Sequence, residues 1–323
     1  MERGLTLELV RVTEAAALAS AEWVGRGLKM EADDAATGAM RAMLDTVPMD
    51  GTVVIGEGEM DEAPMLYIGE QVGAKRGPAV DVAVDPVEGT ELVAKGLDSA
   101  LAVIAIADRG QFLHAPDMYM EKLAVGPALA GKVRLEDPIE ITVRIASEVL
   151  RKPISRMTVS LLERDRHTEL TERLRKLGVK LKLLPAGDVA GAMAPAFEES
   201  GVDLYVGSGG APEGVLAAAA LACMGGELQG RLMFSEDSER ERQRCVEMGI
   251  ADPTKILTMQ DLVGTGDVIF AATGITHGSL LEGVNFTSGD RASTHSMVMR
   301  ASTRTIRFVK SVHYMPVKTK IFA

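Results

Sequence analysis

The 323-residue sequence has few cysteines, no long apolar run and no excess of basic side chains. Its two cysteines, Cys223 and Cys245, cannot form a disulfide framework and are typical of a protein kept in a reducing cytoplasm. The longest apolar run, at 100–107, suits a buried strand but is too short to span a bilayer. We therefore expect a cytoplasmic protein without a membrane segment.

Acidic side chains outnumber basic ones, with 46 Asp and Glu against 35 Lys and Arg, and the formal net charge is −11. Binding to nucleic acid without sequence preference needs a basic surface, and anionic membranes attract polybasic segments. We therefore expect neither nucleic acid nor a membrane as a partner. The apolar share of 46% is ordinary for a globular protein, so a chain of this length can form two packed lobes.

Apolar periodicity predicts a mixed α/β fold. Strands at 158–162 and 180–184 flank a helix at 168–177, which is a βαβ pattern. A strand at 112–114 is expected to form a hairpin with 100–107. A polar, proline-containing stretch suggests two lobes, 1–135 and 136–323, although the C-terminal strands could return to the first. Further helices are expected at 12–24, 33–44 and 214–223, and further strands at 52–55, 80–84, 204–206, 268–271, 296–300 and 305–313.

The sharpest local signal is the turn Asp85-Pro86-Val87-Glu88-Gly89-Thr90, which follows an apolar strand. Two carboxylates three residues apart can bind a hard divalent cation such as Mg²⁺, which prefers oxygen ligands. Gly89 would let the backbone approach a phosphate oxygen. The plain alternative is an Asp-Pro turn with a capping glutamate.

Two more loops of this kind follow predicted strands. The loop 56–62 carries four acids, Glu57, Glu59, Asp61 and Glu62, which repel one another unless a cation offsets their charge. The loop 207–214 is rich in glycine, with Pro212 suited to a first helical turn and Glu213 as a possible ligand. A solvated acidic loop and an ordinary loop-to-helix junction are the alternatives.

Together these loops resemble the lithium-sensitive, metal-dependent sugar phosphatase superfamily. More closely, the chain resembles class II, bacterial-type fructose-1,6-bisphosphatase. The similar stretches are long, and the most specific are Arg11–Glu14, Val53–Tyr67, Ala115–Lys122, Ala272–Thr276 and Ser311–Tyr314. The resemblance implies a layered α-β-α-β-α sandwich with the metals and the substrate between two lobes.

The resemblance also implies roles for individual residues. Metal ligands would be Asp33, Glu57, Asp85, Glu88 and Glu213. Glu57 and Thr90 would handle the attacking water, although Glu57 could equally be a ligand only. Substrate contacts would come from Glu88, Gly89, Thr90, Tyr119, Arg164, Asp165, Arg166, Ala186, Gly187, Asp188 and Gly210.

The activity implied is hydrolysis of the 1-phosphate of fructose 1,6-bisphosphate, in gluconeogenesis or carbon fixation, with Mn²⁺ or Mg²⁺ as the cofactor. Sedoheptulose 1,7-bisphosphate is an alternative or additional substrate. Relatives form homodimers or homotetramers, so a homo-oligomer is expected.

The sequence departs from the family pattern around the substrate. Leu28 and Ala186 replace acids, Met30 replaces a polar residue, Asp165 is an added acid beside two arginines, and Ser208 replaces an isoleucine. These changes could alter substrate preference, an effector site or a third metal site. They also keep open a non-catalytic protein that binds metal and sugar phosphate. An inositol or nucleotide phosphatase is disfavoured by the extended similarity.

Overall fold

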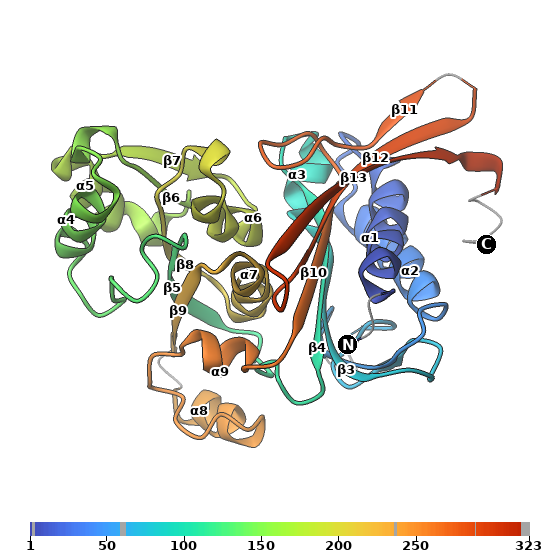
Figure 1. Cartoon of the computed structure of the whole chain (residues 1–323), viewed down its shortest axis with the longest axis horizontal. Coiled ribbons are helices and arrows are strands. Elements are labelled where there is room, and N and C mark those ends of the chain that lie inside the picture. Colours follow the sequence, from blue (N-terminus) through green and yellow to red (C-terminus); the bar gives the residue numbers. More distant parts are fainter. Residues whose placement is uncertain (2–3, 59–62, 236–237, 288, 318–323) are drawn as a thin grey trace. The chain divides into compact units, whose positions relative to one another are not determined.

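The computed structural model describes residues 1, 4–58, 63–235, 238–287 and 289–317, and the elements below refer to those ranges (Figure 1). The chain divides into two compact units, Met1–Gln111 with Gly266–Ala323 and Phe112–Thr265. Each unit is built around one β-sheet with packed helices, which confirms the mixed α/β class. The suggested division at residue 135 falls inside the second unit.

The first unit contains an eight-stranded sheet with the strand order β11-β12-β10-β4-β3-β1-β2, and β13 pairs with β12. Strands β1 and β3 run parallel, whereas β4 is antiparallel to both β3 and β10. The elements of this unit are α1 (Leu5–Ala21), α2 (Lys29–Leu44), β1 (Asp50–Ile55), β2 (Gln71–Val72), β3 (Ala79–Glu88), α3 (Thr90–Lys95), β4 (Leu101–Asp108), β10 (Val268–Gly274), β11 (Asn285–Thr287), β12 (Arg291–Arg300) and β13 (Thr305–Tyr314).

Strand β4 carries the apolar run expected to be a buried strand, and its side chains are buried from Leu101 to Ala107. An uninterrupted apolar run is typical of a strand that is covered on both faces. The expected hairpin with 112–114 is wrong, because β3 and β10 already occupy both edges of β4. The amide N–H of Gln111 instead donates to the Asp81 carboxylate at 2.8 Å, where the first unit ends.

The C-terminal strands belong to the first unit, because β10 pairs with β4 from Val268–Ala107 to Gly274–Leu101. This return is the possibility that the sequence left open. Strand β12 then pairs with β10 on one edge and with β13 along its whole length on the other. The first unit is therefore made from two segments that are far apart in the chain.

The second unit contains a five-stranded sheet with the order β7-β6-β8-β5-β9. Strand β6 is parallel to β7 and β8, so the predicted βαβ unit is confirmed. The elements are β5 (Tyr119–Val125), α4 (Ile139–Leu150), η1 (Ile154–Arg156), β6 (Thr158–Leu162), η2 (Asp165–His167), α5 (Thr168–Leu177), β7 (Lys180–Leu184), α6 (Asp188–Met193), η3 (Ala194–Ala196), η4 (Glu198–Ser200), β8 (Leu204–Gly210), α7 (Ala211–Met224), β9 (Glu227–Leu232), α8 (Ser238–Glu247) and α9 (Met259–Val263).

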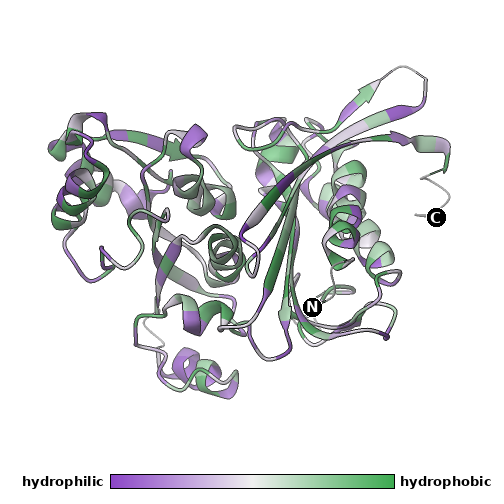
Figure 2. Ribbon diagram, in the orientation of Figure 1, coloured by the Kyte–Doolittle hydropathy of each residue, from purple (hydrophilic) through white to green (hydrophobic). Residues whose placement is uncertain are grey.

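Helices cover both faces of this second sheet (Figure 1), so alternate residues of its strands point toward two different helical layers. Leu123 and Val206 join the apolar core formed with α4 and α5. The other face packs against α6 and α7, whose apolar residues colour them green in Figure 2. Pro212 lies in the first turn of α7, as expected. Within the described ranges, no helix is both long and apolar enough to cross a membrane.

Prediction for the α4 core. Val143 on α4 is fully buried in the apolar core, whereas Ile141 on the same helix is 37% exposed. Val143→Ala should lower the free energy of unfolding by about 2 kcal/mol, because it removes buried methyl groups and leaves a cavity. The matched Ile141→Ala should lower it by less than about 0.5 kcal/mol. Urea unfolding of both variants measures the difference, and equal losses would contradict the assigned core.

Candidate active site

The first two predicted metal ligands, Asp33 and Glu57, come from different parts of the first unit and meet through their side chains. Asp33 lies in the first turns of α2, and Glu57 follows β1. The Glu57 amide N–H donates to the carbonyl of Leu66 at 3.0 Å, which anchors the loop. A Cβ on Gly56 would lie 1.9 Å from the same carbonyl, so the anchored path requires glycine there.

The two carboxyl groups share a hydrogen bond, which raises the pKa of Glu57 and lowers that of Asp33. Burial, followed by the charge and the hydrogen bond of Asp33, raises the pKa of Glu57 to about 8. Burial raises the pKa of Asp33 as well, although the hydrogen bond with Glu57 opposes that shift. Two carboxyls this close can share a proton or can bind a cation that replaces it.

The Asp85–Thr90 segment forms a bulge and a tight turn at the end of β3. The expected strand 80–84 continues to Glu88, and its register with β4 shifts between Asp85 and Glu88. The Val87 amide N–H donates to the Asp85 carboxylate at 3.0 Å. Gly89 has a φ of +90° at the N-cap of α3, and Thr90 is the first residue of that helix. Bulges of this kind re-aim side chains, and Glu88 becomes buried while Asp85 is half-buried.

No three His, Cys, Asp or Glu side chains in the described part of the chain form a group that could hold a metal ion by themselves. Glu59, Asp61 and Glu62 of the predicted acidic loop lie outside the described residues. Mg²⁺ commonly uses only one or two carboxylates together with water and substrate phosphate. The Asp33–Glu57 pair is sufficient for a site of that type.

In the second unit, the glycine loop that ends β8 is shaped by two carboxylates. A Cβ on Gly209 would lie 1.9 Å from Oδ2 of Asp188, and one on Gly210 would lie 2.0 Å from Oε2 of Glu213. Both acids therefore occupy space that any larger residue in the loop would take. Oε2 of Glu213 is buried and has no hydrogen-bond partner among the described residues. Burial raises the pKa of Glu213, with Lys122 acting in the opposite direction.

Arg166 is held by two kinds of contact. Its Nε donates to the Ser208 hydroxyl at 2.9 Å, and an Nη donates to the Ser208 carbonyl at 2.8 Å. Its guanidinium carbon lies 4.5 Å from the centre of the Tyr119 ring, which is a cation–π geometry. Because Arg166 and Tyr119 remain exposed, they form a fixed cationic surface that can receive an anion.

The other predicted substrate residues of this unit lie on two neighbouring loops. Arg164 donates to the carbonyls of Glu163 and Pro185 at 2.8 and 2.7 Å, which connects the loops. Ala186 and Gly187 follow Pro185, and Gly187 is the N-cap of α6, whose first residue is Asp188. Asp165 is exposed in η2 between the two arginines.

Three residues that support this site were not predicted as part of it. Ser208 anchors Arg166, and His167 packs behind it, accepting the Ser208 amide N–H at 2.8 Å and bonding to the Leu162 carbonyl at 2.7 Å. Since an amide only donates, Nε2 is the acceptor and Nδ1 carries the proton. Burial lowers the pKa of His167, which favours this neutral form. The third residue is Lys122, which follows Glu121 on β5, and its sequence signal was its place at the end of the Ala115–Lys122 stretch that carries the family resemblance.

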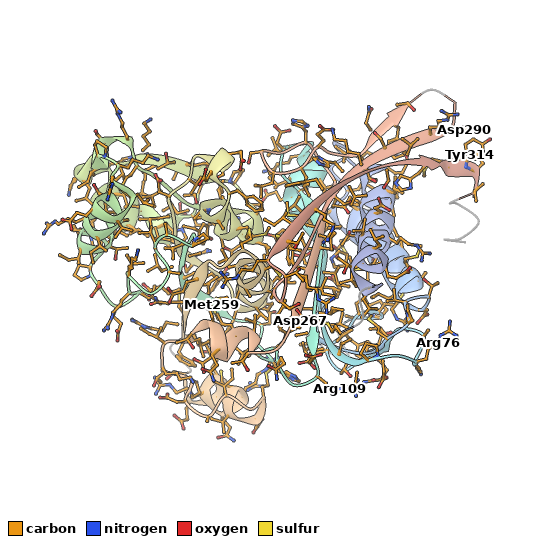
Figure 3. The ribbon with its side chains drawn as sticks, in the orientation of Figure 1. Arg76, Arg109, Met259, Asp267, Asp290 and Tyr314 are labelled. Carbon is orange, nitrogen blue, oxygen red and sulfur yellow. The ribbon has the colours of Figure 1, made fainter. Side chains whose placement is uncertain are left out.

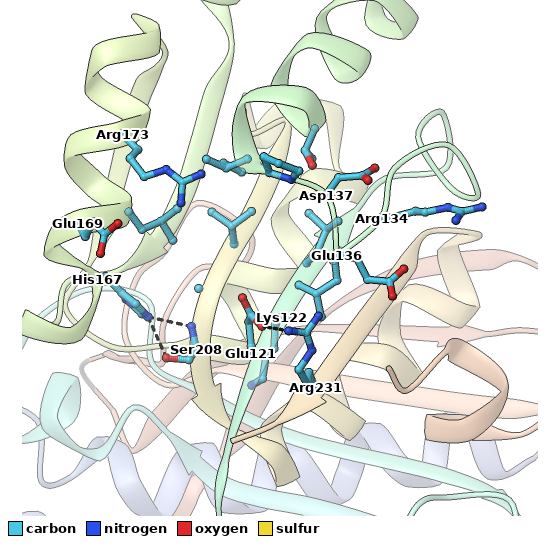
Figure 4. A pocket seen from close by; sticks show the side chains of 18 of the residues that line it. Glu121, Lys122, Arg134, Glu136, Asp137, His167, Glu169, Arg173, Ser208 and Arg231 are labelled. Atoms are coloured by element: carbon cyan, nitrogen blue, oxygen red, sulfur yellow. Dashed lines mark hydrogen bonds and ion pairs between the residues drawn. The ribbon is translucent and has the colours of Figure 1, made fainter. Parts of the chain in front are cut away.

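A cavity of about 490 Å³ lies in the second unit beside this support (Figure 4). Arg166, His167 and Ser208 form part of its wall, together with residues of β5, α4 and α5. Arginines and acids alternate around it, and some pair with one another, such as Arg231 with Glu121 at 3.6 Å. The positive and negative side chains that line the cavity therefore largely balance one another. In this the cavity differs from the exposed face of Arg166, which is cationic.

Prediction for the carboxyl pair. The pKa of Glu57 is higher in the folded chain than its ordinary 4.5, so folding favours the protonated form. This contribution to stability is complete below about pH 4.5 and is lost as the pH rises through about 8. Glu57→Gln should remove that part of the pH dependence in metal-free protein, with an effect of the order of 3 kcal/mol near pH 8. Thermal unfolding in chelator from pH 5 to 8.5 measures it, and parallel curves for both proteins would refute the assignment.

A family model described as bacterial fructose-1,6-bisphosphatase, glpX-encoded, matches residues 3–313. Fructose-1,6-bisphosphatase 1 class 2 of Escherichia coli (strain K12) is 48% identical over 326 residues, covering 98% of this chain and 96% of its own. The class 2 protein of Haemophilus influenzae is 45% identical, covering 98% and 97%. A Synechococcus protein named D-fructose 1,6-bisphosphatase class 2/sedoheptulose 1,7-bisphosphatase is 43% identical, covering 97% and 96%. The chain therefore belongs to the bacterial class 2 fructose-1,6-bisphosphatase family.

Proposed function

We propose that this protein hydrolyses the 1-phosphate of fructose 1,6-bisphosphate to give fructose 6-phosphate and inorganic phosphate, with Mn²⁺ or Mg²⁺ as the cofactor. The observation that carries the proposal is the Asp33–Glu57 pair, two carboxyls brought together with raised pKa values in a chain of this family. Placement in the lithium-sensitive sugar phosphatase superfamily is part of the same proposal. Its support is the strand-end arrangement of the acidic and glycine loops.

The donor set fits a hard divalent cation. Asp33 and Glu57 supply carboxylate oxygens, and Asp85 and Glu88 supply more from the bulge that ends β3. In the second unit, Oε2 of Glu213 is buried without a hydrogen-bond partner in the described part of the chain, as expected for a carboxylate that binds a cation. When bound, a divalent cation lowers the pKa of a bound water and offsets charge on the phosphoryl oxygens.

The protein's own groups then have distinct tasks. We assign Glu57 and the Thr90 hydroxyl to orienting the attacking water and receiving its proton. The αL turn at Gly89 fixes Thr90 at the start of α3 and brings bare backbone to the surface. On the substrate side, Arg166, whose guanidinium lies over the Tyr119 ring, would bind the phosphate that is not hydrolysed. Arg164 lies next to it in the chain's fold. Asp188 would accept hydrogen bonds from sugar hydroxyls, with Gly187 and Gly210 lining the same loops.

Sedoheptulose 1,7-bisphosphate is a second candidate substrate. The name of the Synechococcus relative pairs the two activities. Asp165, exposed between Arg164 and Arg166, would weaken an anion site there, and Leu28, Met30 and Ala186 replace polar residues of the family pattern. We infer that these positions tune substrate preference. A non-catalytic protein that binds metal and sugar phosphate is the remaining alternative.

Prediction for activity. Purified protein should release phosphate from fructose 1,6-bisphosphate in Mn²⁺ or Mg²⁺, and chelator should stop the release. Asp85→Asn and Glu57→Gln should each lower kcat/KM about a hundredfold or more, because each removes a charge that the reaction needs. Glu91→Gln is the matched control, since this half-buried acid of α3 pairs with Lys95 on the helix surface and its substitution should be neutral.

The same assay separates the alternatives. Sedoheptulose 1,7-bisphosphate and inositol 1-phosphate are supplied in parallel at equal concentrations. The affinity for Mn²⁺, measured alongside, distinguishes the two roles considered for Glu57. If Glu57 acts only as a proton acceptor, Glu57→Gln should still bind Mn²⁺. If Glu57 is a metal ligand, Glu57→Gln should lose Mn²⁺ binding. No release from any substrate by folded protein that binds Mn²⁺ would reject the enzyme and favour the binding protein.

We also propose that the protein acts in the cytoplasm as a homodimer or homotetramer. Cys223 and Cys245 are free thiols, as a reducing compartment allows. Strand β13 is an outer strand that pairs with β12 alone in the described sheet. Its side chains Phe308, Val312 and Tyr314 are 54%, 74% and 55% exposed, and Tyr314 is labelled in Figure 3. An exposed apolar edge strand is well suited to pairing with a second copy.

Prediction for assembly. The double variant Phe308→Glu/Val312→Glu should sediment as a monomer, because it places charges on the apolar face of β13. Arg307→Glu is the control, since Arg307 points to the opposite face of the same strand and should leave assembly intact. Analytical ultracentrifugation at micromolar concentration measures the mass. A monomeric parent protein, or an unchanged mass in the double variant, would contradict the assigned surface.

A further inference from the structure

Lys122 is a charged residue in the middle of the second sheet. It is 1% exposed, and it lies on β5 between Glu121 and Leu123, with its side chain on the face that packs against α6 and α7. Buried ammonium groups are tolerated only where they are paired and hydrogen-bonded. The partners of Lys122 therefore show what the residue is for.

Both partners belong to the proposed substrate site. The Lys122 ammonium donates to Oδ2 of Asp188 and to the carbonyl of Gly210, the latter at 2.6 Å. The other oxygen of Asp188 accepts the hydroxyl hydrogen of Tyr205, which is fully buried. Asp188 is thereby fixed by two donors, and a carboxylate has further lone pairs with which it can accept hydrogen bonds from a sugar's hydroxyl groups.

The glycine loop is packed closely around this ammonium. The bare backbone of Gly209 and Gly210 makes room for Asp188 and Glu213, and a Cβ on Gly214 would lie 3.2 Å from Cε of Lys122. The stem and head of Lys122 therefore fill the space beneath the loop. A shorter side chain at this position would remove the lysine donor from both the Asp188 carboxylate and the Gly210 carbonyl, leaving Asp188 with the Tyr205 hydroxyl.

Lys122 also supplies positive charge where negative charge accumulates. Asp188 pairs with it directly, and its charge lowers the pKa of Glu213. A sugar bisphosphate is itself strongly anionic, so two uncompensated carboxylates would repel it. One buried cation therefore both orients the substrate-side groups and reduces that repulsion.

We propose that Lys122 is a positioning residue for sugar bisphosphate binding. It holds Asp188 and the Gly210 carbonyl in the geometry that receives the sugar hydroxyl groups, and it offsets the charge of Asp188 and Glu213. This inference rests on the proposed function. A positioning role for Lys122 can be distinguished from a purely structural one. Removing the Lys122 charge should weaken substrate binding, whereas cation binding should stay equal or become tighter.

The test compares Lys122→Met with Lys152→Met. Met preserves the length and removes the charge. Lys152 is the matched control, since it is a half-buried lysine of the same unit that donates to Asp203 at 2.7 and 2.9 Å and lies outside the site. KM and kcat for fructose 1,6-bisphosphate are measured at saturating Mn²⁺, and the Kd for Mn²⁺ is measured by electron paramagnetic resonance.

For Lys122→Met we expect KM to rise about tenfold or more, kcat to change by less than about threefold, and the Kd for Mn²⁺ to stay equal or fall. Lys152→Met should lose stability with KM unchanged. Adding Lys122→Met to Asp188→Asn should raise KM no further than Asp188→Asn alone, because the lysine acts through that carboxylate.

The outcomes are separable. Hydrolysis by the parent protein with an unchanged KM in folded Lys122→Met overturns this inference alone. No hydrolysis by the parent protein rejects the proposed function and the inference with it. If Lys122→Met does not fold, Tyr205→Phe decides, because it removes the second donor to Asp188 and keeps the charge. A raised KM in that variant supports the positioning network, and an unchanged KM overturns it.

Discussion

Carboxyl groups that approach one another inside a fold need a proton, a cation or a hydrogen-bond donor between them. Each unit of this protein meets that constraint differently. In the first unit, Asp33 and Glu57 share a hydrogen bond, and the pKa of Glu57 rises to about 8, so a proton compensates the pair when no cation is present. In the second unit, Asp188 and Glu213 face the buried ammonium of Lys122. The proton that compensates Asp33 and Glu57 can be exchanged, whereas the Lys122 ammonium that compensates Asp188 and Glu213 is a permanent part of the fold.

This difference suits the tasks proposed for the two sets of residues. A proton shared by two carboxyls can be displaced by a divalent cation, which suits the metal-binding role proposed for Asp33 and Glu57. A lysine on an interior strand cannot leave, so Asp188 keeps one orientation in the proposed substrate site. The surrounding backbone serves the same end. Gly56 lets the Glu57 loop follow the Leu66 carbonyl, and Gly209 and Gly210 leave room for the two acids of the second unit.

Local patterns in the sequence predicted much of this fold, whereas long-range pairing was beyond them. The βαβ unit, the buried strand β4 and the start of α7 at Pro212 follow from periodicity and turn chemistry. The hairpin at 112–114 was wrong because β4 already pairs with β3, the strand before it in the chain, on one edge and with β10, which is remote in sequence, on the other. The acids remain predicted ligands. The Ser208–Arg166 contacts and the Lys122 partners were missed because they join residues 42 and 66 positions apart.

In the proposed metal site, Asp33 and Glu57 hold a proton that gives way to a cation. Calorimetric titration with Mn²⁺ at pH 7, repeated in buffers of different ionisation enthalpy, counts the protons released on binding. Binding should release about one proton per chain, and Glu57→Gln should lose that release. Mn²⁺ binding with no proton release, or an equal release in Glu57→Gln, would contradict it.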